Sequence, residues 1–299
     1  MSAQIALRQR GMAVIAALLV VVAAAALTTS IIERQGILAN ILITESDRSQ
    51  AAWALQGGLD LSRVVLQMDA GNGPTTRLDG IWARSIIELP VGPAGDPESA
   101  LLSGGIEDEQ GKYNLRNLAE HGIINPRQVL VLERLLEWLG MAPTLGATMA
   151  QRVADAQPGQ EGGPLAVGLR SIEDLSALPG FTPQVVNALQ PYVTVLPAAT
   201  PVNANTASAE VLGAVVEELG LAGARQLVID RDQGLWFVNQ ADFVSRLRGR
   251  QPDAGKLISV SSNWFRVTGE VTVGDTMAGL RVLLHRNDHG LSSVRWVTY

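Results

Sequence analysis

The first quarter of the chain combines a long apolar run with helical spacing behind it. Residues 12–32 contain no charged residue and no proline. After them, apolar residues recur every three or four positions, as on one face of a helix, and the first proline is Pro74. The pattern predicts a nearly continuous helix from about residue 12 to about residue 69. Because adjacent glycines are poor helix formers, a bend is expected at Gly57–Gly58.

The apolar run has the length of a membrane-spanning helix. Its 21 residues extend about 32 Å at 1.5 Å each, against about 30 Å for the hydrocarbon core of a bilayer. Arg8 and Arg10 precede the run, and no acidic residue occurs before Glu33. The positive-inside rule then keeps the short N-terminus in the cytoplasm and places the rest outside. A cleaved secretory signal is the alternative, but its apolar region is normally shorter, about 7 to 15 residues.

Beyond the long helix, the pattern changes to strand, to helix and back to strand. Short segments rich in β-branched and aromatic residues, bounded by Gly, Pro, Asn and Asp, predict strands at 81–91, 99–107, 264–273, 280–286 and 293–299. Between them, Asn125 and Pro126 start an amphipathic helix that Gly140 ends. Strands interrupted by helices and then resumed indicate an α+β fold with an inserted all-α domain.

Composition and charge exclude several classes of protein. The chain of 299 residues is 47% apolar and 17% charged, which is ordinary for a globular protein. The formal net charge of −6 argues against a nucleic-acid or anionic-lipid binder. The absence of cysteine excludes disulfides, thiolate zinc sites and thiol nucleophiles.

No enzymatic motif is present, and we expect a protein that is not an enzyme. P-loop, G-x-S-x-G and G-x-G-x-x-G patterns are all missing. The three histidines, His121, His285 and His289, lack metal-ligand spacing. Asp230–Gly234 is similar to half of an EF-hand loop, but Ala241 stands where the closing glutamate would be.

The N-terminus resembles that of type IV pilins and pseudopilins. The resemblance rests on the basic leader ending in Gly11, followed by Met12 and the apolar run. It implies that a prepilin peptidase cleaves after Gly11 and methylates Met12. Most of these proteins carry a glutamate at the fifth mature position, here Ala16. GspK, a minor pseudopilin of type II secretion systems, is the family that lacks it. A carboxylate buried in lipid is costly unless it is paired with a positive charge. In a pilus the resemblance gives that charge as the terminal amine of the subunit ahead, so a subunit at the front of the filament does not need the carboxylate.

Further segments resemble GspK in the order in which they occur in that family. These segments are 106–118, 175–181, 191–197, 202–207, 210–212 and 261–267. The resemblance implies a type IV pilin-like long N-terminal helix with an antiparallel sheet, plus an inserted all-α domain of helix-hairpin-helix or SAM-like type. The implied divisions are a leader (1–11), a transmembrane helix (12–32), a spine helix with the first strands of the head (33–113), an inserted α-domain (114–255) and the C-terminal strands of the head (256–299).

The same resemblance implies a function in assembly. A GspK-type protein caps the tip of the type II secretion pseudopilus and supports protein export across the outer membrane. The implied partners are GspI-like and GspJ-like minor pseudopilins, the prepilin peptidase, the inner membrane and secreted proteins, with no nucleic acid. The implied location is a single pass through the inner membrane, with the N-terminus cytoplasmic and the head periplasmic.

A membrane-anchored helix-hairpin-helix protein that binds or takes up DNA is the alternative. Asn205 and Thr206 precede an apolar-periodic run, which predicts Thr206 as a helix N-cap and Gly220 as the end of that helix, with a second helix after it. Residues 178–181 resemble the turn of another hairpin. Charge favours a packing role instead, because residues 171–250 hold five basic and eight acidic side chains, about −3 in sum, and phosphate binding depends on cations.

A calcium ion is implied only by the resemblance, because GspK proteins bind calcium. The segment similar to the family's acidic D-x-D stretch is Asp155–Gln157, followed by Glu161. One carboxylate of the pattern is replaced by an amide, whereas calcium prefers several charged oxygens. Asp275 and Asp288, in loops that join strands, are further candidates. The sequence therefore assigns no set of calcium ligands.

Overall fold

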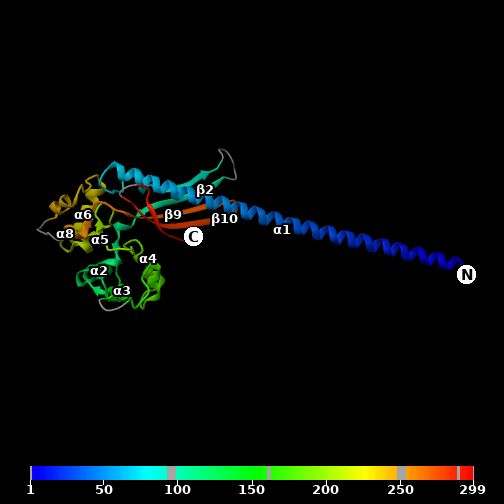
Figure 1. The fold of residues 1–299 in the computed structure, drawn as a ribbon, viewed down its shortest axis with the longest axis horizontal. Coiled ribbons are helices and arrows are strands. Elements are labelled where there is room, and N and C mark those ends of the chain that lie inside the picture. The colour runs from blue at the N-terminus through cyan, green and yellow to red at the C-terminus, as the bar shows by residue number, and fades with distance from the viewer. Residues whose placement is uncertain (1, 93–98, 160–162, 248–253, 288–289, 299) are drawn as a thin grey trace.

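A single helix forms the long axis of the molecule. The computed structural model describes residues 2–92, 99–159, 163–247, 254–287 and 290–298. Helix α1 (Ser2–Asn72) runs as one extended rod, with its N-terminal half projecting far from the remaining elements (Figure 1). It continues without interruption through Gly57–Gly58, where the sequence predicted a bend. A Cβ atom on Gly58 would lie 3.1 Å from Cδ2 of Leu102, so this glycine lets α1 approach the sheet closely.

Among the described residues, five antiparallel strands form the sheet of the head, in the spatial order β1-β2-β9-β10-β11. They are β1 (Ile86–Val91), β2 (Ala100–Asp108), β9 (Trp264–Val273), β10 (Thr276–His285) and β11 (Ser293–Thr298). The first predicted strand is partly wrong, because Ile81–Ala83 form a 3-10 turn that buries Trp82. The predicted strand at 280–286 begins earlier, at Thr276, because a tight turn at Gly274 joins it directly to β9.

The core of the head lies between α1 and one face of this sheet. Alternate residues of β9 and β10 point to that face, as the period of two in a strand requires. Phe265 and Val282 are among the fully buried side chains there, and Leu55 and Leu66 reach them from α1. Burial of these residues holds the C-terminal half of α1 to the sheet, because removing apolar surface from water is the main favourable term in folding.

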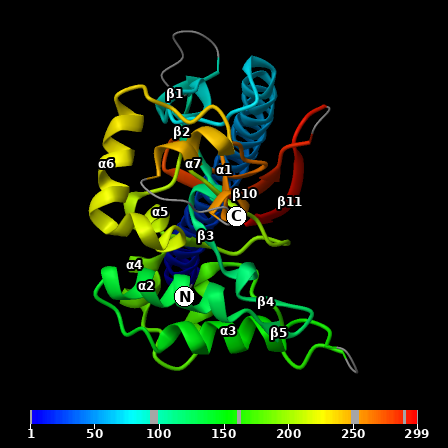
Figure 2. The same ribbon diagram turned by 90° about the vertical axis from the view of Figure 1, so that its left-hand side faces the viewer.

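The chain leaves the sheet at Asp108 and returns to it at Trp264, and the helices lie between. They are α2 (Pro126–Trp138), α3 (Leu145–Asp155), α4 (Pro183–Leu189), α5 (Ala209–Val215), α6 (Gly220–Asp232), α7 (Gln240–Arg246) and α8 (Ala254–Leu257). Short two-stranded ladders join β3 (Tyr113–Asn114) to β6 (Val193–Thr194), β4 (Ala119–Glu120) to β5 (Ile123–Ile124), and β7 (Val202–Asn203) to β8 (Ile258–Ser259). Figure 2 shows two groups, with α2–α4 on one side and α5–α7 nearer the sheet.

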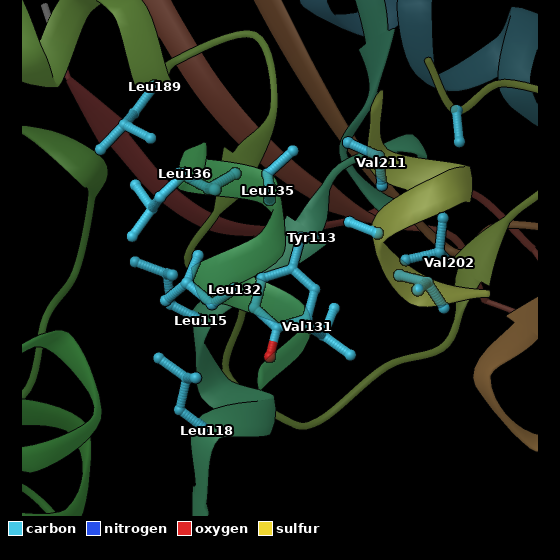
Figure 3. Packing of buried hydrophobic residues seen from close by; sticks show 14 of the residues in the cluster. Tyr113, Leu115, Leu118, Val131, Leu132, Leu135, Leu136, Leu189, Val202 and Val211 are labelled. Carbon is cyan, nitrogen blue, oxygen red and sulfur yellow. The ribbon is translucent and has the colours of Figure 1, made fainter. Parts of the chain in front are cut away.

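One hydrophobic core joins the two groups of helices. Leu132 and Leu135 of α2 pack beside Tyr113, and Val202 and Val211 approach from the second group (Figure 3). The helices therefore form one packed domain inserted into the head.

The start of α2 is confirmed in detail. Asn125 precedes the helix, Pro126 is its first residue, and the Asn125 side chain accepts hydrogen bonds from the backbone N–H groups of Arg127 and Gln128. These bonds satisfy donors that the first turn of a helix leaves without partners.

The predicted cap of the next helical hairpin is wrong. Ser208, not Thr206, caps α5, since its hydroxyl accepts from the N–H of Val211. Thr206 instead donates its hydroxyl to the buried carboxylate of Asp108. The predicted end is also wrong, because α5 stops at Val215 and Gly220 begins α6.

Candidate functional site

The residues of the predicted processing site lie on the part of α1 that projects beyond the head. Gly11, Met12 and Ala16 all belong to this helix, and the side chains of Met12 and Ala16 are exposed. Among the described residues, α1 contains the one helix long and apolar enough to cross a membrane, found from Val14 onward. The geometry leaves this end accessible to lipid, to another helix or to a processing enzyme.

Asp108 is the centre of a buried polar network where the helical domain meets the head. Its carboxylate accepts hydrogen bonds from Ser262 Oγ (2.6 Å), Thr206 Oγ1 (2.6 Å), Asn203 Nδ2 (3.0 Å) and the backbone N–H of Gln110 (2.8 Å). Burial raises the pKa of Asp108, and the hydrogen bonds oppose that rise. Its partners come from the 3-10 turn at Glu109–Gly111 directly after β2, from the segment before α5 and from the segment that returns to the sheet.

Glu109 ties the other helical group to the same strand end. Lys112 Nζ lies 2.9 Å from Glu109 Oε1, and Arg266 of β9 lies 2.7 Å from the same atom. Thr194 of β6 donates its hydroxyl to Glu109 Oε2. Lys112 and Arg266 also pair with Glu107; burial raises the pKa of Glu107, but the two cations lower it overall. Paired charges with several hydrogen bonds are the form in which buried ions are tolerated.

Gln110 and Gly111 complete this junction. Gln110 Oε1 accepts from the backbone N–H groups of Asn263 (2.6 Å) and Trp264 (3.2 Å), where the chain re-enters the sheet. A Cβ on Gly111 would lie 2.8 Å from Thr206 Oγ1 and 3.2 Å from the backbone carbonyl of Thr206. Each residue from Asp108 to Gly111 thus has a structural partner across the boundary.

Sequence reasoning missed the third part of the junction. Arg286 is buried and donates to Asp69 Oδ2 (3.1 Å) of α1, to Thr76 Oγ1 (2.6 Å) and to the carbonyl oxygen of Ser262. Burial raises the pKa of Asp69, although the Arg286 guanidinium opposes the rise. Asp69 and Arg286 are 217 positions apart, and no local pattern marks either as a partner. The arrangement holds α1, Thr76 and the segment before β9 together.

The residues similar to a calcium-binding stretch do not form a ligand set in the described part of the chain. Asp155 accepts from Gln151 Nε2 (2.7 Å). Gln157 is buried and fully used, since its Nε2 donates to the carbonyl of Ala119 and its Oε1 accepts from Gly122 N–H. Across the described residues, no group of three or more His, Cys, Asp or Glu side chains could hold a metal ion. Glu161 and Asp288 lie outside the described residues.

Two of the basic residues within 171–250, Arg231 and Arg246, are used internally. Arg231 is buried and donates to the carbonyl oxygens of Ala204 (3.1 Å) and Ala207 (2.6 Å). Arg246 pairs with Asp242 and also donates to backbone carbonyls. Arg248 and Arg250 lie outside the described residues. Cations that satisfy protein carbonyls are poorly placed to neutralise phosphates.

The exposed surface of α1 has the character of an assembly site. Within the head, Trp53 is 77% exposed and Met68 is 61% exposed, and Val64 lies between them on the same helix face. A large aromatic side chain left in water on a rigid helix is a typical anchor of a protein interface.

Comparison with known proteins gives this surface its context. Two family models, both described as type II secretion system (T2SS), protein K, match residues 111–198 and 202–261. A type II secretion system protein K of Pectobacterium carotovorum subsp. carotovorum is 30% identical over 316 aligned residues, covering 93% of both chains. The chain belongs to the type II secretion system protein K family. A relative from Pseudomonas aeruginosa is 28% identical and covers 94% of this chain and 90% of its own.

The fold agrees with this membership. The structure is similar to a chain of the GspK-GspI-GspJ complex from enterotoxigenic Escherichia coli, with a TM-score of 0.65 at 18% identity, over 85% of this chain and 97% of that one. The predicted α+β fold, with a long N-terminal helix, an antiparallel sheet and additional helices, is confirmed. The chain is a minor pseudopilin of type II secretion.

Proposed function

We propose that this minor pseudopilin caps the tip of the type II secretion pseudopilus and acts through assembly, without catalysis. The observation that carries the proposal is the contrast along the molecule, with a bare apolar helix at one end and a broad helical domain at the other (Figure 1). The apolar end can be held in the inner membrane and against neighbouring helices. The broad end, which includes α2 and α3, would obstruct a subunit stacked above it, so the top of a filament suits it.

In this proposal the mature chain begins at Met12, after cleavage behind Gly11, and Met12 is methylated. The helix then crosses the inner membrane once, and the head stands in the periplasm. The division of the head from an inserted domain at 114–255 belongs to the same proposal. N-terminal mass analysis of the membrane-extracted protein tests the processing step, with a methylated Met12 expected as the first residue. An intact leader, or cleavage near residue 30, would refute it.

The proposed partners are GspI-like and GspJ-like minor pseudopilins, as in the complex of the structural relative. Trp53 and Val64 supply an exposed apolar face for lateral packing of a partner helix. The prepilin peptidase and exported proteins are further proposed partners. Co-purification of the full chain with tip partners expressed in the same membrane is the direct measurement.

The residue at position 16 tests the tip location itself. Ala16 is exposed on α1 inside the apolar segment, so a subunit below the tip would lack the carboxylate that most pilins place there. Ala16→Glu should reduce tip initiation or allow misplacement along the filament, and Ala16→Gln, of similar size but uncharged, is the control. Equal secretion and unchanged tip occupancy for both variants would argue against the proposal.

A further inference from the structure

A polar cleft of about 510 Å³ lies between the two groups of helices. Residues between positions 113 and 128 of the first group form one wall, and Val215 and Leu257 of the second group border the other. Residues 197–201, which lead from β6 of the first group to β7 of the second, run along the cleft. They are called the strap below. Ligand sites have volumes of about 300–1,000 Å³ and often lie between packed units of a protein, so the cleft has a suitable size and place.

The strap is held from one side by an asparagine. Pro197 and Pro201 have no backbone N–H, so these residues pair poorly as a regular strand. Asn117 supplies the missing partner, because its Nδ2 donates to the carbonyl oxygen of Thr200 (2.9 Å) and its Oδ1 accepts from the Thr200 N–H (3.0 Å). The next residue toward the first group, Ala199, is exposed. Within the described ranges, its N–H and C=O make no hydrogen bond. The strap therefore offers a ligand one backbone donor and one backbone acceptor.

Arg116 is fixed in the cleft with one edge of its guanidinium unused. Its Nη1 donates to the carbonyl oxygen of Ala119 (3.1 Å), which orients the planar group. In the part of the chain that the structure describes, its Nε and Nη2 have no hydrogen-bond partner and the side chain forms no ion pair. The N–H groups of Nε and Nη2 lie side by side and match the two oxygens of a carboxylate. A guanidinium that is already oriented loses less side-chain entropy when a ligand binds.

Other side chains of the cleft also leave donors available. Gln128 Oε1 accepts from the Tyr113 hydroxyl (3.0 Å), and Gln128 Nε2 has no partner among the residues described. Lys256 adds a second cation to the lining. Glu120 is the one acid in the described lining, and its side chain is 87% exposed, beside His121. The chain has a net charge of −6, yet the described lining of this cleft holds more cations than anions. These groups favour a ligand that is anionic and rich in hydrogen-bond acceptors.

We propose that this cleft binds a carboxylate-bearing segment of another polypeptide. The carboxylate, from an acidic side chain or from a C-terminus, accepts from Nε and Nη2 of Arg116. A phosphate ion could also accept from Arg116, but it carries no backbone amide to donate to the Ala199 carbonyl while a carbonyl accepts from the Ala199 N–H. A peptide does both. The site belongs to the inserted domain and goes beyond the proposed function, because it does not depend on where the protein stands in a filament.

The experiment titrates the full chain, purified in detergent, into a peptide carrying a neutral dye on its N-terminus, and follows fluorescence anisotropy. The probe is Ala-Ala-Glu-Ala-Ala with a free C-terminus. Three matched peptides carry an amidated C-terminus, glutamine in place of glutamate, or both changes. We expect the acidic probe to bind and the doubly neutral peptide to bind at least about tenfold more weakly. The single change that weakens binding identifies which carboxylate occupies Arg116.

Variants of Arg116 test the same contact from the side of the protein. Arg116→Gln removes the charge and should weaken binding of the acidic probe about tenfold. Arg116→Lys keeps the charge without the paired donors and should still bind at least about threefold more weakly than wild type. The control is Arg225→Gln, which makes the same change of charge at an exposed residue paired with Glu210 outside the cleft, and it should bind as wild type does. Near-ultraviolet circular dichroism checks that each variant is folded, and the comparison among peptides needs no variant.

Several outcomes would overturn the proposal. Equal binding of the acidic and doubly neutral peptides would remove the role of the carboxylate, and wild-type affinity in Arg116→Gln would remove the role of Arg116. Absence of binding by the acidic probe would overturn the site itself. A single-stranded oligothymidylate that binds more tightly than the probe, and loses affinity in Arg116→Gln, would assign the cleft to nucleic acid instead. Each of these results leaves tip assembly and processing at Met12 untouched, because those are measured by co-purification and by mass analysis.

Discussion

Gly111→Ala is expected to loosen the joint between the head and the helical domain. The new Cβ would stand 2.8 Å from Thr206 Oγ1, closer than real Cβ atoms come, and 3.2 Å from both carbonyl atoms of Thr206. The hydroxyl cannot rotate away freely, because it donates to Asp108 at 2.6 Å. The carbonyl cannot move without shifting the start of the second helical group. The added methyl group must therefore displace one wall of the junction.

The magnitude follows from these two contacts. Forcing an extra carbon into a packed site costs about 1–3 kcal/mol, and a lost hydrogen bond to a charged group costs about 1.5–3 kcal/mol. One displacement causes both losses, so they do not add fully, and we expect a loss of about 2–4 kcal/mol in the free energy of unfolding. For a chain of this size, that lowers the melting temperature by about 4–16 °C.

The assay is thermal unfolding of the full chain in detergent, followed by near-ultraviolet circular dichroism. Gly57→Ala is the matched control, because a Cβ there meets no atom within 4 Å and the site lies in the middle of α1. The control should be more stable than wild type by about 0.5–1 kcal/mol, since alanine favours the helix. A melting temperature for Gly111→Ala within about 1 °C of wild type would refute the reasoning.

Three further predictions concern other parts of the molecule. Asn125→Ala should cost about 1 kcal/mol in denaturant unfolding, because the first turn of α2 loses its cap. Arg281→Ala removes an ion pair with Glu173 that is about half exposed, and should change stability by less than about 1 kcal/mol, an effect that 1 M salt abolishes. Asp108→Asn tests the sign of a pH effect: burial raises the folded-state pKa of this acid above 3.8, so its contribution to stability is present below 3.8 and is lost as pH rises through the raised value. As the pH is lowered from 7, the free energy of unfolding of wild type should therefore rise relative to that of the variant. The same pH dependence in both proteins would contradict the raised pKa of Asp108.

Local signals in the sequence were sufficient to predict several helices and strands. The strand predicted at 264–273 matches β9, because β-branched and aromatic residues alternate between two faces there and Gly274 ends it. The start of α2 is likewise encoded within a few residues by Asn125 and Pro126. In both places the residues that decide the structure are neighbours in the chain.

The predictions that failed concern residues whose partners are distant in the chain. Thr206 has the chemistry of a helix cap, but the carboxylate of Asp108, 98 positions earlier, takes its hydroxyl, so Ser208 serves as the cap instead. The pair of Asp69 and Arg286 is set by tertiary packing alone. The exposed positions of α1 could be located from periodicity, but the close approach of α1 to β2 at Gly58 could not, since it depends on tertiary packing.

The junction suggests why an insertion can be carried by a pilin head without becoming a separately moving part. Asp108 holds the second helical group through Asn203 and Thr206, and the next residue, Glu109, holds the first group through Thr194. Both groups are thus attached where β2 ends, through its last residue Asp108 and the next residue Glu109, and both side chains are buried. Buried hydrogen bonds are lost together when a domain swings away, and leaving such groups without partners costs far more than breaking an exposed contact. A load on the helical domain therefore reaches the sheet and α1 directly, as the proposed position at the tip of a filament would require.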